Sequence, residues 1–297
     1  MNRTLIIVLL MQLVTFGADA QTKACACACR AESATYTKAD STLIVRLLKE
    51  ARSLDKKTNI TLHFANKFIG IPYVAHTLEV NDEERLVVNT RQLDCTTLVE
   101  TVTALTLCQM KGDTTFNDYK RALTRLRYRN GKRDGYTSRL HYFSDWIRDK
   151  QAMGITTEIQ MPNPPFTALQ TVKVSYMSNH PDSYKALKAN PELVKVIASQ
   201  EKALSGITAR YIPKSQVSNT KVMRDAVKDG DIIAITCSKP GLDIAHLGFA
   251  VWKSDGLHLL NASQLHKKVV LEPMTLGQYL SKHPSHTGIR IIRINKN

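Results

Sequence analysis

The fold of this chain is decided by the stretch Arg91-Gln92-Leu93-Asp94-Cys95-Thr96-Thr97-Leu98-Val99-Glu100. A polar residue, Asp94, stands just before Cys95, and an apolar pattern with three- and four-residue spacing begins just after it. This pattern predicts a buried helix from Cys95 to about Met110. A thiol at a helix N-terminus faces the positive end of the helix dipole, so this position predicts a lowered pKa and a nucleophilic thiolate. The alternative is a small buried hydrophobe, the usual role of a lone cysteine.

A histidine opens a strand-like run far downstream, Ala245-His246-Leu247-Gly248-Phe249-Ala250-Val251-Trp252. On a strand, His246 shares a face with Gly248 and Ala250, whose small size predicts room for a helix to approach closely. A cysteine followed much later by a histidine is typical of a cysteine hydrolase. The thiolate would attack a carbonyl carbon, and the imidazole would protonate the departing amine. The alternative for His246 is a core histidine whose ring nitrogens are satisfied.

A base of this kind needs a third group that orients it. Asn261, on the next predicted strand, shares the core-facing side with Leu257 and is our candidate. The alternative is a strand-end asparagine that starts a turn. His258 falls on the opposite face and His266 in the turn, so both are weaker candidates.

The period of the hydrophobic pattern changes along the chain. Helical spacing predicts helices at 38–58, 59–69, 95–110, 118–129 and 182–205. Alternation in the last third predicts five short strands, at 231–236, 246–252, 257–263, 268–271 and 289–294. Helices first and an antiparallel meander last predict an α+β fold, with N-terminal helices packed on a C-terminal antiparallel sheet or barrel.

Two further segments stand out. A short strand is predicted at 84–90. The polar and aromatic stretch at 130–145, with its glycines and three aromatic rings, predicts a structured functional loop. Tyr136 and Tyr142 in this loop suit the face of a sugar.

The chain starts with a predicted secretory signal peptide, residues 1–20, in which an apolar run follows Arg3 and small residues precede Gln21. The apolar run is too short to span a membrane, so we expect an exported protein with no membrane span. Residues 21–37 are predicted to be a flexible tail, and 38–297 a single catalytic domain with a helical and loop insertion around 111–205.

The composition is that of a globular protein of 297 residues with a formal net charge of +15, which favours anionic partners. Export argues against nucleic acid, and solubility alone is the alternative explanation of the charge. Cys25, Cys27 and Cys29 have no partner cluster at zinc spacing, so no metal site is predicted. Cys108 and Cys237 are expected to pack in the core.

Longer motifs carry a family resemblance. Gly70-Ile71-Pro72-Tyr73, the Asp94-Cys95 helix start, Ala245-His246-Leu247-Gly248 and a polar residue on the next strand resemble the papain-like NlpC/P60 cysteine peptidases. More narrowly, the stretches 94–100, 135–142 and 239–246 resemble the DUF1460 branch, described as N-acetylmuramoyl-L-alanine amidase-like. This resemblance covers the chain from about residue 40. Two departures are His76-Thr77 in place of paired glycines, and Asn261 where the superfamily often has histidine.

The resemblance implies a periplasmic or otherwise exported hydrolase of peptidoglycan fragments that cuts the amide between N-acetylmuramic acid and L-alanine. It implies Cys95 as nucleophile, His246 as general base and acid and Asn261 as orienter, with no cofactor. A stem-peptide (γ-D-glutamyl) endopeptidase would use the same three residues. The alternative from another functional class, a binding protein and not an enzyme, is a non-catalytic envelope-binding protein.

Three more residues are candidates for contact with the muropeptide substrate. Tyr73 is expected to line the cleft. Arg139 and His141 are our candidates for binding the acidic stem peptide, because arginine pairs carboxylates bidentately. The alternative for Arg139 is a structural role in bracing its loop.

Overall fold

The computed structural model of this protein describes residues 34–296. The predicted signal peptide, most of the predicted tail and its three cysteines lie outside the described residues. The elements below belong to one compact unit, Thr35–Asn297, except that β1 begins at Ala34. No helix in the described range is long and apolar enough to cross a bilayer.

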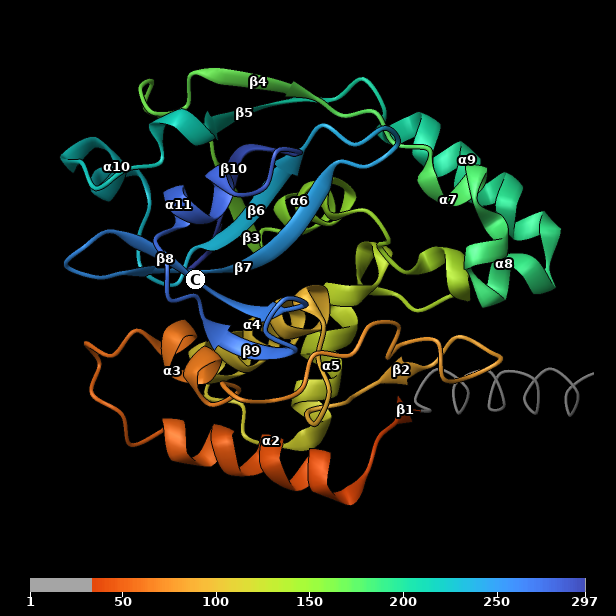
Figure 1. Ribbon diagram of the computed structural model, residues 1–297. Helices are drawn as coiled ribbons and strands as arrows, with labels where there is room; N and C mark the ends of the chain where they lie inside the picture. Colours follow the sequence, from red (N-terminus) through yellow and green to blue (C-terminus); the bar gives the residue numbers. More distant parts are fainter. Residues whose placement is uncertain (1–33, 297) are drawn as a thin grey trace, which may run out of the picture. The chain divides into compact units, whose positions relative to one another are not determined.

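Most of the helices lie in the first two thirds of the described chain (Figure 1). The longer ones are α2 (Lys38–Ala51), α3 (Ile60–Asn66), α4 (Cys95–Lys111), α5 (Phe116–Arg127), α6 (Phe143–Ala152) and α9 (Pro191–Leu204). The shorter ones are α7 (Tyr176–Asn179), α8 (Lys185–Ala189), α10 (Lys221–Ala226) and α11 (Leu276–Ser281). Single 3₁₀ turns lie at Arg129–Gly131, Tyr136–Ser138, Pro181–Ser183 and Lys214–Gln216.

The strands form a two-stranded and an eight-stranded sheet. The small sheet pairs β1 (Ala34–Thr35) with β2 (Leu86–Val87). The large sheet contains β3 (Thr156–Ile159), β4 (Ala168–Thr171), β5 (Thr208–Pro213), β6 (Ile232–Cys237), β7 (Ile244–Trp252), β8 (Leu257–Ser263), β9 (Lys268–Leu271) and β10 (His286–Ile294).

The large sheet is open, with strand order β4-β5-β10-β6-β7-β8-β9 and β3 paired to β10. Every strand pair in it is antiparallel. The predicted mixture of helices and antiparallel sheet is therefore confirmed, but the described residues form no closed barrel. The reason is that β10 returns to pair with β6 and β5, so no strand joins β9 to the other edge of the sheet.

Helix α4 is the central helix of the fold and begins at Cys95 as predicted. Asp94 accepts a hydrogen bond from the Thr97 N–H at 2.7 Å, and Thr97 Oγ1 accepts one from the Asp94 N–H at 2.9 Å. This capping box satisfies donors that a helix start leaves unpaired. The helix contacts α2, α3 and α5 as well as β7 and β8 of the large sheet (Figure 1). Its burial between helices and sheet explains why it is apolar on several faces.

The five predicted strands are all present, with ends shifted by a few residues. Strands β3, β4 and β5 and helices α6 and α11 were not predicted. The stretch 130–145 is two 3₁₀ turns followed by the start of α6, whose Phe143, Trp146 and Ile147 are buried. These elements are short, and tertiary packing rather than a long periodic pattern specifies them.

Gly248 gives a first testable consequence. A Cβ built at Gly248 would lie 2.6 Å from the Leu260 carbonyl oxygen and 2.8 Å from the Leu259 side chain. The small residue therefore makes room for strand β8, not for the helix that the sequence predicted.

We expect Gly248→Ala to lower the free energy of unfolding by about 1–3 kcal/mol, because the backbone of β8 must move to admit the methyl group. Urea denaturation followed by circular dichroism measures this change. An unchanged denaturation midpoint would contradict the close approach of the two strands.

Candidate active site

Cys95 lies at the tip of α4 as a half-buried free thiol. Burial and then the charge of Asp94 raise the pKa of this thiol to about 12, although hydrogen bonds from Leu247 and Thr96 act in the opposite direction. The thiol is therefore protonated at neutral pH. This is opposite to the lowering that the helix position alone predicts, because the desolvation of the thiolate outweighs the N–H groups around it.

His246 and Asn261 are brought together by the neighbouring strands β7 and β8. His246 Nε2 lies 2.9 Å from Asn261 Oδ1. Asn261 is fully buried, and its Nδ2 donates to the Leu259 carbonyl oxygen at 3.3 Å, which sets the orientation of its amide. Asn261 Oδ1 therefore accepts from His246 Nε2–H, and the Nδ1 atom of the ring is left as the acceptor.

The imidazole of His246 is neutral at neutral pH. Burial lowers its pKa, the hydrogen bond to Asn261 partly opposes this, and the charge of His283 lowers it further. Asp94, beside Cys95, is close enough to raise the pKa of His246. The thiol in turn is within hydrogen-bonding reach of the backbone N–H of Leu247, the residue that follows His246. Helix α4 thus presents Cys95 to the part of β7 that carries the imidazole.

Tyr73 lies beside the start of α4. Its backbone N–H donates to the Lys267 carbonyl at 2.9 Å, and it bridges to Leu93, two residues before Cys95. Burial, followed by the charges of the Cys95 thiolate and Asp94, raises the pKa of Tyr73 to about 12. The phenol is therefore uncharged at neutral pH, and the role of Tyr73 in lining the substrate cleft stays a prediction.

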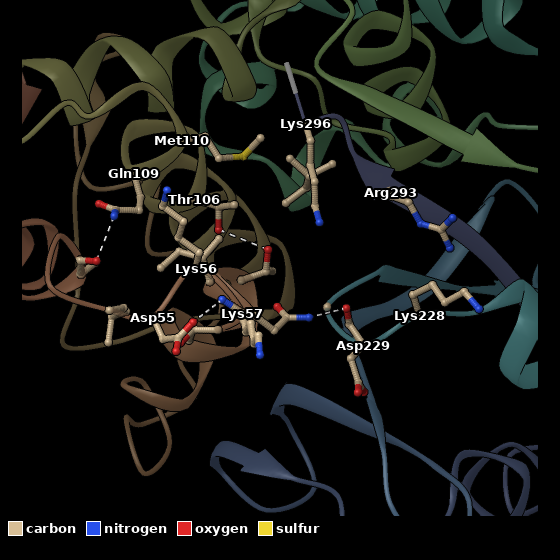
Figure 2. A pocket seen from close by; sticks show the side chains of 18 of the residues that line it. Asp55, Lys56, Lys57, Thr106, Gln109, Met110, Lys228, Asp229, Arg293 and Lys296 are labelled. Carbon is tan, nitrogen blue, oxygen red and sulfur yellow. Dashed lines mark hydrogen bonds between the residues drawn. The ribbon is translucent and has the colours of Figure 1, made fainter.

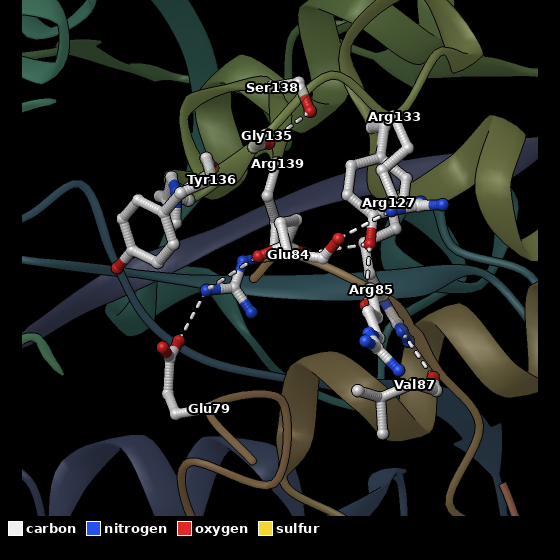
Figure 3. A network of polar contacts seen from close by, with 12 residues as sticks. Glu79, Glu84, Arg85, Val87, Arg127, Arg133, Gly135, Tyr136, Ser138 and Arg139 are labelled. Atoms are coloured by element: carbon white, nitrogen blue, oxygen red, sulfur yellow. Dashed lines mark hydrogen bonds and ion pairs between the residues drawn. The ribbon is translucent and has the colours of Figure 1, made fainter. Parts of the chain in front are cut away.

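Arg139 is held inside a network of polar side chains (Figure 3). It is 5% exposed, pairs with Glu79, lies 3.8 Å from Glu84 and stacks 4.9 Å from the centre of the Tyr136 ring. The Tyr128 hydroxyl donates to Glu84 at 2.8 Å. This geometry favours the bracing role for Arg139, because its guanidinium is already engaged by two carboxylates.

His141 belongs to the same loop. Its Nε2 lies 3.0 Å from the Tyr136 carbonyl oxygen. Burial, and then the positive charge of Arg139, lowers the pKa of His141 to about 3. The ring is therefore uncharged at neutral pH and offers no cation to an acidic peptide.

The polar network also reaches α4. Arg127, 2% exposed, donates to Glu100 of α4 at 2.7 Å and to the Val87 carbonyl oxygen at 2.6 Å (Figure 3). The C-terminal end of α5 is thereby tied to the helix that carries Cys95. Within residues 34–296, no group of three or more His, Cys, Asp or Glu side chains could hold a metal ion.

Comparison with known proteins identifies the family. A family model described as AmiA-like, N-acetylmuramoyl-L-alanine amidase-like, matches residues 63–289. The chain belongs to this AmiA-like family. This confirms the amidase-like family that the long motifs predicted, while membership of the NlpC/P60 superfamily stays a prediction.

Solved structures agree with this assignment. An N-acetylmuramoyl-L-alanine amidase from Bacteroides uniformis is 40% identical, over 80% of this chain and 98% of that chain, with a TM-score of 0.74. A Bacteroides fragilis protein that carries a provisional xylanase name is 43% identical, over 78% and 100% of the two chains, with a TM-score of 0.73. A Legionella pneumophila protein of the DUF1460 family model, 23% identical over 85% and 94% of the two chains with a TM-score of 0.66, shares the fold. No curated protein matches the chain.

Several residues near Cys95 in this AmiA-like chain were missed by the sequence reasoning. Tyr279 on α11 has its pKa raised to about 12 by burial and then by the charges of Glu272 and the Cys95 thiolate. Glu272 is fully buried, and one of its oxygens lies 3.2 Å from His266 Nε2. A signal in the sequence was the helical i, i+4, i+7 spacing of Tyr279, His283 and His286.

A cavity of about 1020 Å³ lies at the other end of α4 (Figure 2). Its walls come from 51–61, from Thr106, Gln109 and Met110 of α4, and from 228–231 and 293–296. Because α4 has 17 residues and rises about 1.5 Å per residue, its two ends are about 25 Å apart. The candidate active site at Cys95 is therefore chosen for its chemistry and lies away from this cavity.

The pH dependence of activity tests the state of the thiol and imidazole. A general base must be unprotonated, so activity is lost as the pH falls through the pKa of His246. Because burial lowers this pKa, we expect the acid limb of kcat/KM to lie below pH 6.5. We expect no alkaline limb between pH 7 and 9, because the Cys95 thiol stays protonated to about pH 12. A bell-shaped profile with an acid limb near pH 4 and an alkaline limb near pH 9 would instead indicate a preformed thiolate–imidazolium pair.

Arg139→Ala tests the bracing role. Removing the guanidinium leaves the buried Glu84 without its cation, so we expect a loss of about 3–5 kcal/mol in the free energy of unfolding, measured by urea denaturation. KM should change by the same factor for muropeptides with acidic and with neutral stems. A larger rise in KM for the acidic stem than for the neutral one would contradict the bracing role and indicate that Arg139 contacts the substrate.

Proposed function

We propose that this protein is a cysteine amidase of peptidoglycan fragments, with Cys95 as nucleophile, His246 as general base and acid, and Asn261 as orienter. The observation that carries the proposal is the 2.9 Å contact of His246 Nε2 with Asn261 Oδ1, because it directs the basic Nδ1 atom away from Asn261 on a strand packed against α4. In the papain-like order of nucleophile, base and polar residue, this is the arrangement that activates a thiol.

The first step is attack by the thiol. Since the free thiol is protonated, His246 Nδ1 takes its proton as sulfur bonds to the carbonyl carbon. The carbonyl oxygen gains negative charge, and the backbone N–H of Cys95, which has no partner within the helix, is a natural donor to it. The phenol of Tyr73 is a second neutral donor beside the thiol.

The second step breaks the carbon–nitrogen bond. The imidazolium, held by Asn261 at Nε2, gives its proton to the departing amine, and a thioester remains on Cys95. Water, deprotonated by His246, then attacks the thioester and releases a carboxylic acid and the free thiol. Each proton that His246 takes is returned, so the cycle leaves the protein unchanged.

The bond cut is proposed to be the lactyl–L-alanine amide of N-acetylmuramyl peptides. The AmiA-like family match and the amidase name of the Bacteroides uniformis relative support this bond. The provisional xylanase name of the other relative fits the geometry less well. A glycosidase needs two carboxyl groups that flank the sugar bond, whereas Asp94 caps α4 and Glu272 is fully buried. We further propose that the protein is exported and acts in the periplasm, on the basis of residues 1–20.

Cys95→Ala tests the nucleophile. A methyl group replaces a thiol of similar size at a half-buried site, so the fold should persist while hydrolysis of a muramyl peptide falls below detection. Cys108→Ala and Cys237→Ala are matched controls that remove the other free thiols among residues 34–296, and both should keep activity. Turnover by a correctly folded Cys95→Ala protein would contradict the assignment of Cys95 as the nucleophile.

Product analysis tests the bond. Digestion of a defined muramyl tetrapeptide should give an intact stem peptide with a free L-alanine amino group and a peptide-free sugar, identified by mass spectrometry. A stem-peptide endopeptidase would leave L-alanine on the sugar. Recovery of muramyl-L-alanyl-D-glutamate would replace the amidase assignment with that alternative.

A further inference from the structure

The cavity at the end of α4 that lies away from Cys95 is built from four segments of the chain (Figure 2). They are the loop between α2 and α3, the last two turns of α4, the turn before β6 and the end of β10. Pockets that enclose small ligands have volumes of about 300–1,000 Å³. This cavity, with a volume of about 1020 Å³, is therefore large enough for a ligand of several linked groups and not only for a single ion.

The walls of the cavity are joined by hydrogen bonds between these segments (Figure 2). Gln109 Nε2 of α4 donates to the Ala51 carbonyl oxygen at 2.9 Å, and Asn59 Nδ2 donates to the Asp229 carbonyl oxygen at 2.6 Å. Gly230 permits the second contact, because a Cβ at this position would lie 2.8 Å from Asn59 Oδ1. The walls are therefore held together as a fixed part of the fold.

The residues that line the cavity carry an excess of positive charge, since six of them are basic and three are acidic. Arg293 is compensated by Asp231, whose two oxygens lie 2.8 and 2.7 Å from its guanidinium nitrogens. Within residues 34–296, the ammonium groups of Lys56, Lys57 and Lys296 make no ion pair and no hydrogen bond. These three lysines come from two separate segments, so they favour a ligand that carries more than one anionic group.

The other two aspartates of the lining make the cavity less suited to a dense polyanion such as a polyphosphate. Asp55 Oδ1 accepts from the Lys57 N–H at 2.7 Å, and Asp229 Oδ1 accepts from the Trp252 N–H at 2.6 Å. The second oxygen of each carboxylate has no hydrogen bond within residues 34–296. These oxygens would repel closely spaced phosphates, but they can accept from an amine or an amide N–H. With Met110 as an apolar wall, the lining therefore suits a peptide.

We propose that this cavity is a second binding site of the protein, separate from Cys95, and that its ligand is a short acidic peptide. The carboxylates of the peptide pair with the three lysines that lack a protein partner, and its amino group and N–H groups donate to the two aspartates. The stem peptide that the proposed amidase reaction releases belongs to this class of ligand. That identification alone rests on the proposed function, whereas the site itself does not.

The peptide in the cavity is a different molecule from one whose amide lies at Cys95. A fully extended chain spans at most about 3.6 Å per residue, so a four-residue stem reaches no farther than about 14 Å. The two ends of α4 are about 25 Å apart. Binding in the cavity therefore leaves the thiol accessible to a substrate.

Calorimetry with the inactive Cys95→Ala protein tests the site without turnover. The probe is the synthetic peptide L-alanyl-D-glutamyl-L-alanyl-D-alanine, and the comparison is the same peptide with both carboxylates converted to amides. In this background, the combined change of Lys56→Gln, Lys57→Gln and Lys296→Gln should raise Kd for the acidic peptide about threefold or more, because three exposed ion pairs are lost. Binding of the amidated peptide should not weaken. No binding of the acidic peptide, an unchanged Kd, or an equal rise for both peptides would overturn the proposal.

The matched control removes the same charge elsewhere. Lys173 after β4, Lys188 on α8 and Lys202 on α9 are exposed and do not line the cavity. Changing these three lysines to glutamine should leave Kd for the acidic peptide unchanged. A loss as large as that of the cavity variant would show that binding follows the net charge of the protein, and would overturn the site. Inorganic phosphate that binds as tightly as the acidic peptide would overturn the assignment of a peptide ligand.

A second measurement leaves the lysines intact and locates the bound peptide. Met110 lines the cavity, whereas Met177 is buried in the apolar cluster around α7 and α9. In the Cys95→Ala protein labelled at its methionine methyl groups, the acidic peptide should shift the NMR resonance of Met110 and not that of Met177. No shift at Met110 would overturn the site. Since the synthetic peptide contains no muramyl amide, this result does not depend on which bond the protein cuts, and failure of the amidase assignment would appear in the product analysis alone.

Discussion

The site depends on one constraint, the place where α4 begins. The capping box between Asp94 and Thr97 fixes the first turn, and burial of the following residues between α2, α3, α5 and the sheet fixes the axis. A helix cap of this kind contributes only about 1 kcal/mol to the free energy of unfolding. Its importance here is positional, because a buried helix cannot shift by one residue without opening the core. The position of Cys95 relative to β7 is therefore fixed.

Burial has two opposite effects on the same groups. It keeps the Cys95 thiol and the His246 imidazole uncharged, which removes the advantage that a thiolate at a helix tip would have. It also strengthens each hydrogen bond that the reaction needs, since the local dielectric is low. Asn261 accepts a hydrogen bond without carrying a charge, so it orients His246 and holds the proton of the neutral ring at Nε2. The chemistry that suits such a pair is attack coupled to proton transfer.

Much of this could be predicted from the sequence, for identifiable reasons. The central helix and the strands β6 to β10 carry long periodic patterns, and in an antiparallel meander the alternation of faces also predicts that His246 and Asn261 meet. The partners of Arg139 could not be predicted in this way, because Glu79 is 60 residues distant and joins it through a loop without a period. Tyr279 was missed because α11 has only six residues, too few for a clear periodic pattern.

The loop that carries Arg139 is held by buried ion pairs. Arg139 pairs with Glu79, and Arg127 pairs with Glu100 of α4. Such pairs add little net stability, but removal of one partner leaves a buried charge without compensation, so the pairs hold the segments that they join in one position. Because Glu100 belongs to the helix that begins at Cys95, this network supports the geometry of the thiol.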